Sequence, residues 1–145
     1  MDAKTAYLEG SVIGATPERR LMVLLEGAVN FILRARAALA EGRLDDCHNC
    51  TVKAQDIYLE LLVALDPEAG DYVAHLQGLY YLLYDVLLDA NIRKDDGRFA
   101  EALAIGERLR DLWDEVVKAA AAEKARQAAA EAPPEPPVQR LNLAG

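Results

Sequence analysis

The chain has 145 residues, of which 52% are hydrophobic and 28% are charged, and its formal net charge is -8. This length predicts one domain with a sizeable core, whereas the acidic balance argues against binding to nucleic acid or to an anionic membrane face. The first residues, MDAKTAYLEG, lack the features of a secretory signal, and no apolar run reaches the length of a membrane span. We therefore expect a cytoplasmic protein without membrane insertion.

The N-terminal segment, residues 1–15, contains Gly10 and Gly14 and is too short to form a bundle helix. It nevertheless carries apolar side chains that must be covered. These are Tyr7, Leu8, Val12 and Ile13. We expect this segment to act as a lid over part of the bundle.

A first helix is predicted from about Pro17 to Glu41. Thr16 provides an N-cap and Pro17 occupies the first helical position, which is a favourable start signal. Apolar residues at positions 21, 25, 28, 32, 35 and 39 alternate spacings of four and three, a pattern typical of a helix packed against other helices.

Three further helices follow in chain order. Gly42, a C-cap signal for the first helix, lies in a short break, after which the second helix runs to about Leu65. The third helix covers about 72–92. Asp95 or Asp96 caps the fourth, on which Trp113 is expected to anchor the core. Short connections make successive helices antiparallel neighbours, so the fold class is all-α, an antiparallel up-down four-helix bundle.

The predicted organisation therefore has three parts. A lid occupies residues 1–15, and the bundle occupies residues 16–120 as the functional domain. Residues 121–145 begin with a strong helix-forming stretch, AAEKARQAAAEA, and end in a proline-rich tail. We expect the alanine-rich stretch to extend the last helix.

The residues that most resemble catalytic or metal-binding groups do not form a complete site. Cys47 and Cys50 have the C-x-x-C spacing, but a redox motif of this kind normally follows a strand, and zinc needs four ligands. His75, on another helix, raises the alternative of a histidine phosphotransfer or other signalling adaptor domain, although Gln77 and Gly78 do not match the expected spacing and charge. We expect no catalytic residue, metal or cofactor, and therefore no enzyme.

The apolar surface of the helices exceeds what one bundle seam needs. Leu33 and Leu62 also lie off their seams, while Tyr81, Asp85 and Asp89 form the narrow polar stripe of the third helix. An apolar surplus of this kind predicts a groove for a partner helix. Helical phase assigns the groove to Leu24, Phe31, Ile57, Leu61, Tyr80 and Tyr84.

From about Ala6 to Lys118 the chain resembles the flagellin export chaperone family, FliS. The matching segments are AYLEGSVIGATPERRLMVLLEGAVNFI, KAQDIYLELLVALDPEAGDY, LYYLLYDVLLDANIRKDD and LRDLWDEVVK. Glu26 stands where the family usually has aspartate, and Tyr81 replaces an aspartate in the third helix.

This resemblance implies a cytoplasmic helical chaperone that binds the disordered C-terminal segment of flagellin. Such a protein prevents premature polymerisation and delivers its client to a component of the flagellar type III export gate. The resemblance also implies that the N-terminal segment folds over the binding surface and moves aside. We expect a monomer or a weak homodimer.

Overall fold

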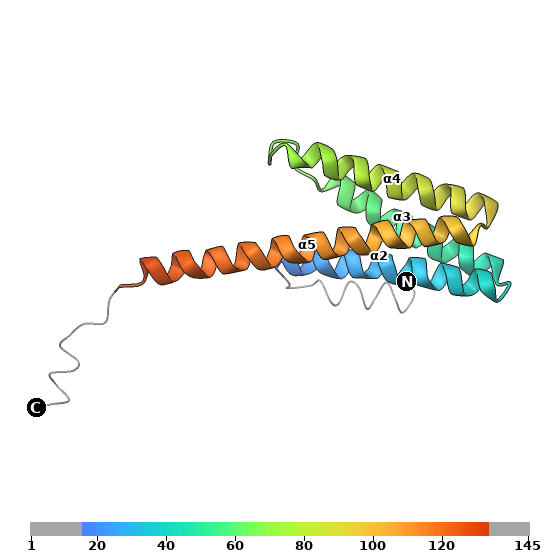
Figure 1. Ribbon diagram of the computed structural model, residues 1–145, viewed down its shortest axis with the longest axis horizontal. Coiled ribbons are helices and arrows are strands. Elements are labelled where there is room, and N and C mark those ends of the chain that lie inside the picture. Colours follow the sequence, from blue (N-terminus) through green and yellow to red (C-terminus); the bar gives the residue numbers. More distant parts are fainter. Residues whose placement is uncertain (1–15, 134–145) are drawn as a thin grey trace, which may run out of the picture. The chain divides into compact units, whose positions relative to one another are not determined.

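The computed structural model describes residues 16–133. They form four helices, α2 (Pro17–Ala40), α3 (Leu44–Val63), α4 (Tyr72–Arg93) and α5 (Asp96–Glu131), and this part of the chain contains no strand (Figure 1). The prediction of an all-α helical bundle is confirmed. The predicted lid residues Tyr7, Leu8, Val12 and Ile13 lie outside the described residues.

The chain divides into two compact units, Met1–Asp114 and Glu115–Gly145. The first unit contains α2, α3, α4 and the part of α5 that ends at Asp114. In the second unit, residues 118–133 are all exposed, and their alanine-rich sequence favours helix without tertiary packing. No helix within residues 16–133 is long and apolar enough to cross a membrane.

Helix α2 begins as its sequence predicts. The Thr16 side chain accepts a hydrogen bond from the Arg19 backbone N–H at 3.2 Å, and Pro17 occupies the first helical position. After α2, Gly42 adopts φ +73°, a left-handed conformation that glycine tolerates better than other residues. These local signals set where α2 begins and where the chain turns from α2 into α3.

Helices α2 and α3 pair in opposite directions. Arg20 near the start of α2 forms an ion pair with Glu60 near the end of α3 at 3.4 Å. Farther along α2, the Phe31 ring centroid lies 5.6 Å from the Nζ atom of Lys53. Residue numbers rise along α2 as they fall along α3, so these two helices are antiparallel.

Helices α3 and α4 are also antiparallel, because residue numbers fall along α3 as they rise along α4. Gln55 donates from Nε2 to the Tyr84 backbone oxygen at 3.3 Å, and the Asn91 Nδ2 and His48 Nδ1 atoms lie 2.9 Å apart. Gln55 and Asn91 are both buried. The buried side chains of Gln55 and Asn91 are therefore hydrogen-bonded across the seam, as is usual for buried amides.

Helix α5 packs against α2 within the first unit. Arg36 forms a forked pair with Asp96, with donor–acceptor distances of 2.9 and 3.0 Å. One side of α5 also approaches α2 at Gly106, where an added Cβ would lie 3.6 Å from Ile32 Cδ1. The backbone of α5 comes close to the core here because glycine has no side chain.

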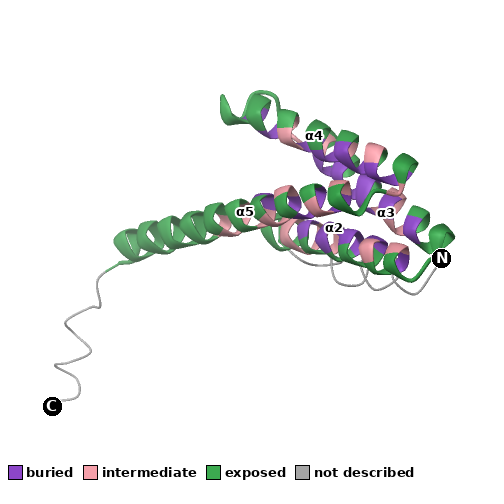
Figure 2. Ribbon diagram, turned by 45° about the vertical axis from the view of Figure 1, so that its right-hand side comes forward, coloured by how far each residue is buried: buried purple, intermediate pink, exposed green. Residues whose placement is uncertain are grey.

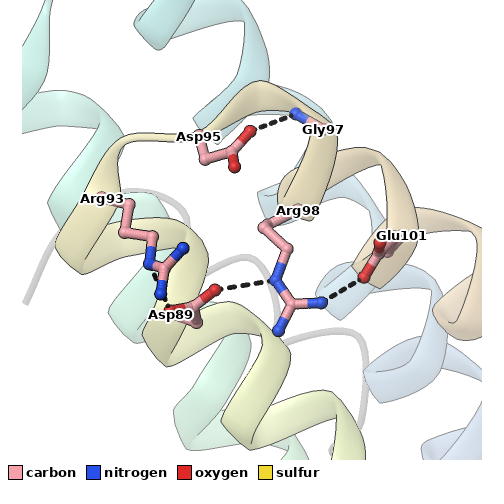
Figure 3. Close-up of polar contacts among 6 residues, drawn as sticks. All are labelled: Asp89, Arg93, Asp95, Gly97, Arg98 and Glu101. Atoms are coloured by element: carbon pink, nitrogen blue, oxygen red, sulfur yellow. Dashed lines mark hydrogen bonds and ion pairs between the residues drawn. The ribbon is translucent and has the colours of Figure 1, made fainter.

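A carboxylate in the turn after α4 caps the N-terminus of α5. Lys94 ends α4 with φ 50°, and Asp95 Oδ1 accepts a hydrogen bond from the Gly97 backbone N–H at 2.9 Å (Figure 3). The predicted cap by Asp95 or Asp96 is thus confirmed at Asp95. The cap fixes the reversal that brings α5 back along α4.

An ion-pair network links the two helices beside this turn (Figure 3). Asp89 accepts from Arg93 Nε at 2.9 Å and from Arg98 Nε at 2.7 Å. Arg98 also donates to Glu101 at 2.6 Å. Because Asp89 bridges two arginines on different helices, it helps to set the angle between α4 and α5.

The core lies between the helices of the first unit, where Figure 2 shows the buried residues. Its largest fully buried side chains come from all four helices. They are Tyr58, Tyr80, Phe99, Leu25, Ile32, Leu83, Leu87, Thr51 and Cys47. Trp113, the predicted core anchor, is half-buried and packs against this core.

Candidate functional site

The outer faces of α3 and α4 carry two exposed stripes with the same pattern. Each stripe follows helix spacing of four, three and four, so its side chains share one face. The α3 stripe consists of Val52, Asp56, Leu59 and Val63, and the α4 stripe consists of Tyr81, Asp85, Leu88 and Ile92. Apart from half-buried Val52, every member of both stripes is exposed. We call these residues the α3–α4 surface.

A pocket of about 360 Å³ lies within this surface. Both helices contribute to its lining, which is mainly apolar and aromatic. The lining residues are Tyr58, Leu59, Leu62, Tyr80, Tyr81, Tyr84 and Asp85. An apolar pocket with a few polar groups at its edge is the usual form of a site that receives an anchoring side chain.

Two buried tyrosines support the pocket from below. The Tyr58 and Tyr80 ring centroids are 6.3 Å apart, and Tyr80 Oη accepts a hydrogen bond from Trp113 Nε1 at 3.1 Å. Burial raises the pKa of both phenols, so both remain neutral donors or acceptors at physiological pH. Packed rings of this kind form a rigid wall.

The seam beneath the surface is held by hydrogen bonds at its middle and near one end. The Gln55 side chain donates to the backbone oxygen of Tyr84, which sets the register between α3 and α4 at this point. Near the end of α4, Lys94 Nζ donates to Asn91 Oδ1, which leaves the Asn91 amide nitrogen to donate to His48 Nδ1. These contacts position the two exposed stripes relative to each other.

The structure brings together only two of the six residues predicted for the groove. Tyr80 and Tyr84 both line the pocket. The other four do not line this pocket, because they occupy α2 or the flank of α3 that faces α2. Phe31, Ile57 and Leu61 are 6, 7 and 6% exposed and belong to the core, and Leu24 is half-buried.

Sequence reasoning missed most of the α3–α4 surface. Leu59, Leu88 and Ile92 are 41, 43 and 74% exposed, yet none of them was among the residues predicted for the groove. Tyr81 was assigned to the narrow polar stripe of the third helix; it is 58% exposed, as on an outer face, and it also lines the pocket. The available signal was the matching spacing of the two stripes.

The groups considered for metal or redox chemistry occupy different environments. Cys47 is fully buried, and burial raises the pKa of its thiol, which disfavours the reactive thiolate. Cys50 is half-buried and His75 is exposed. Within residues 16–133, no group of three or more His, Cys, Asp and Glu side chains is placed to hold a metal ion.

A helical bundle with an exposed apolar surface and an apolar pocket has the form of the helix-in-groove class of peptide-binding proteins. The comparisons with known proteins agree, because the family model described as Flagellar protein FliS matches residues 1–120. The chain belongs to the FliS family, and the resemblance seen in the sequence is confirmed.

Several curated relatives carry the name flagellar secretion chaperone FliS. The Bacillus subtilis protein is 31% identical over 114 residues, covering 79% of this chain and 85% of the relative. The Campylobacter jejuni protein is 30% identical over 115 residues, with 79 and 90% covered. The Salmonella typhimurium protein is 29% identical over 121 residues, with 82 and 90% covered. This is a family of flagellar secretion chaperones, which is not a class of enzyme.

Proposed function

We propose that this protein is a cytoplasmic export chaperone for flagellin. It binds the disordered C-terminal segment of flagellin, prevents premature polymerisation and assists delivery to a component of the flagellar type III export gate. The observation that carries this proposal is the α3–α4 surface, where Leu59, Tyr81 and Leu88 remain exposed around a pocket. Membership of the FliS family supports the identity of the client.

The energetics of this surface suit a client that folds on binding. Ordering a disordered segment costs roughly 2–5 kcal/mol or more. Complete burial of a Leu or Phe side chain contributes about 1.5–3 kcal/mol. Leu59, Tyr81, Leu88 and Ile92 are already 41, 58, 43 and 74% exposed, so covering them with a client's apolar face offsets that cost without nucleotide hydrolysis.

The groove predicted from helical phase enters this proposal in two parts. Tyr80 and Tyr84 form part of the pocket wall. Leu24, Phe31, Ile57 and Leu61 remain a prediction for a second contact region on the α2 side, which a client reaches only by displacing the groups that bury them.

The N-terminal segment is proposed as a lid for a client surface. Its support comes from the sequence, in which Tyr7, Leu8, Val12 and Ile13 supply apolar side chains within residues 1–15. Deletion of residues 1–14 should leave the bundle folded and should not weaken the affinity for a flagellin C-terminal fragment. A large loss of affinity in calorimetry would reject the lid.

A complex with a flagellin C-terminal fragment is the direct test of the proposed function. The fragment should come from the organism that encodes this chain and should form a stoichiometric complex in gel filtration and calorimetry. Gel filtration of the chain alone tests the expected monomer or weak homodimer. Absence of any complex contradicts the chaperone function.

A matched pair of double variants tests the α3–α4 surface. Leu59→Ser with Tyr81→Ser should weaken client binding at least tenfold, because both apolar contacts with the client are removed. A tenfold loss of affinity corresponds to about 1.4 kcal/mol, which is less than the roughly 1.5–3 kcal/mol that burial of one large apolar side chain contributes. Leu112→Ser with Tyr72→Ser is the control, since these residues are 44 and 54% exposed on other faces, against 41 and 58% for the tested pair. Equal losses in the two variants, or loss of helical circular dichroism in the tested one, contradict the assignment.

A further inference from the structure

Each exposed stripe of the α3–α4 surface has one carboxylate at the same place in its pattern. Asp56 and Asp85 are both exposed and each occupies the second position of its stripe. Neither carboxylate forms an ion pair with any other residue in the described range 16–133. Two unpaired carboxylates thus interrupt an otherwise apolar surface.

The two carboxylates lie at the same level of the helix pair. The residues immediately before them, Gln55 and Tyr84, are joined by the 3.3 Å hydrogen bond across the seam. Since α3 and α4 are antiparallel, Asp56 and Asp85 lie one residue to either side of this contact, so their levels agree to within about 3 Å, less than one helical turn. Asp85 also lines the pocket beside Tyr81.

The basic groups of α3 and α4 are directed to other contacts. Lys53 lies over the Phe31 ring of α2, and Arg93 forms an ion pair with Asp89. Lys94, which follows α4, donates a hydrogen bond to the Asn91 backbone oxygen. The α3–α4 surface is therefore acidic at its middle, in a chain whose net charge is already -8. A partner that covers a carboxylate without supplying a cation removes water from that charge at a cost.

We infer that the segment bound on this surface carries a Lys or Arg at the level of Asp56 and Asp85, between apolar side chains one turn to either side. This inference rests on the proposed function and specifies the chemistry of the client segment. The α4 stripe from Tyr81 to Ile92 spans about 16 Å, or three helical turns. The occupant is accordingly a short amphipathic helix with an apolar–basic–apolar order along its contact face.

Three designed peptides test this order directly. Each is a helical peptide of about 18 residues, or five turns, with the same apolar face and with Arg, Gln or Glu at its central contact position. Calorimetry should rank the affinities Arg above Gln above Glu, with about three- to tenfold between the Arg and Gln peptides. The difference should shrink at high salt, because exposed charges are screened.

Two variants of the protein complete the test. Asp56→Asn with Asp85→Asn should abolish the ranking, and Asp56→Lys with Asp85→Lys should reverse it. Glu18→Gln with Glu26→Gln is the control for the Asn variant, since both glutamates are exposed on α2 and the change in net charge is the same. The control should keep the ranking, because its charges lie off the α3–α4 surface.

Several results overturn the inference. They are equal affinities for the three peptides, no binding of the Arg peptide, and a ranking that survives neutralisation of both aspartates. These outcomes are distinct from failure of the proposed function, which is shown by the flagellin fragment not binding at all. Normal binding of that fragment with no charge ranking rejects the central cation alone.

Discussion

Gly106 lies where α5 makes a close backbone approach to the core. A Cβ atom at this position would lie 2.7 Å from Tyr58 Oη and 3.6 Å from both Ile32 Cδ1 and Val29 Cγ2. Tyr58 is 1% exposed, and its hydroxyl has no hydrogen-bond partner in the described part of the chain. The absence of a side chain at 106 thus makes room for a buried hydroxyl.

Replacement of this glycine should destabilise the protein. Gly106→Ala forces the Tyr58 ring or the α5 backbone to move, and overpacking of this kind costs about 1–3 kcal/mol. Urea unfolding followed by circular dichroism measures the free energy of unfolding. Gly78→Ala is the control, because nothing lies within 4 Å of an added Cβ there, and it should stabilise α4 by about 0.5–1 kcal/mol.

A double variant separates this clash from other effects. Tyr58→Phe removes the hydroxyl that meets the new methyl group, so it should recover much of the stability lost in Gly106→Ala. If the two substitutions add their separate effects on the free energy of unfolding, the contact between residues 58 and 106 is not the cause.

At the scale of the elements, one ion pair joins the end of α2 to the start of α5. Arg36 Nε and an Nη atom donate to the two carboxylate oxygens of Asp96 at 2.9 and 3.0 Å. This hydrogen bonding lowers the pKa of Asp96 below its ordinary value of 3.8. The paired carboxylate therefore remains ionised in the folded state at a pH where the unfolded chain takes up a proton.

The sign of the pH dependence follows from that shift. A lowered carboxyl pKa in the folded state contributes stability above the ordinary value, and this contribution is lost as pH falls through the folded-state pKa. Asp96→Asn should therefore lower stability slightly near neutral pH, and the difference from the parent chain should shrink below about pH 4. Urea unfolding at about pH 7 and about pH 3 measures the difference.

The arginine partner provides the control for this effect. In an Arg36→Gln background, Asp96→Asn should have no comparable pH-dependent effect, because the donor that lowers the carboxyl pKa is absent. A difference that persists at the same pH values in that background would assign the effect to the position of Asp96 in the first turn of α5.

The same elements show how much the sequence predicts. Local signals gave the helices closely: the predicted third helix, 72–92, is Tyr72–Arg93 in the structure, and Thr16 and Asp95 cap as expected. These signals depend on neighbours within a few residues, which the sequence displays directly.

The exposed α3–α4 surface was harder to predict because it depends on packing between helices. The helical periodicity of the sequence shows that Ile57 and Leu59 lie on different flanks of α3. It does not show which of these flanks another helix covers. In the structure Ile57 is 7% exposed and Leu59 is 41% exposed. The surplus of apolar residues was thus visible in the sequence, whereas the face that stays open was set by the placement of α2 and α4.

At the scale of the whole molecule, the last residues of α5 contribute little buried surface. Residues 118–133 are all exposed, and the family model ends at residue 120. Helix without burial is stabilised by local propensity and by side-chain pairs such as Arg126 with Glu123, which are small contributions for each residue.

Truncation after Ala120 should therefore leave the fold intact. The melting temperature should change by less than about 2 °C, because substitutions or deletions of exposed groups rarely cost more than about 0.5 kcal/mol. Thermal circular dichroism should show a smaller helical signal but the same cooperative transition. A fall of 10 °C or more, on the order of 2 kcal/mol, would mean that the removed residues stabilise the first unit.

The hydrogen bond from Trp113 to Tyr80 has a practical consequence. Trp113 is the only tryptophan in the sequence, and its indole bonds a tyrosine that lines the α3–α4 pocket. Indole emission responds to hydrogen bonding and to nearby water, so the native chain contains its own optical reporter. Titration of an unlabelled ligand into the pocket should shift the intrinsic fluorescence, and Tyr80→Phe should alter that response.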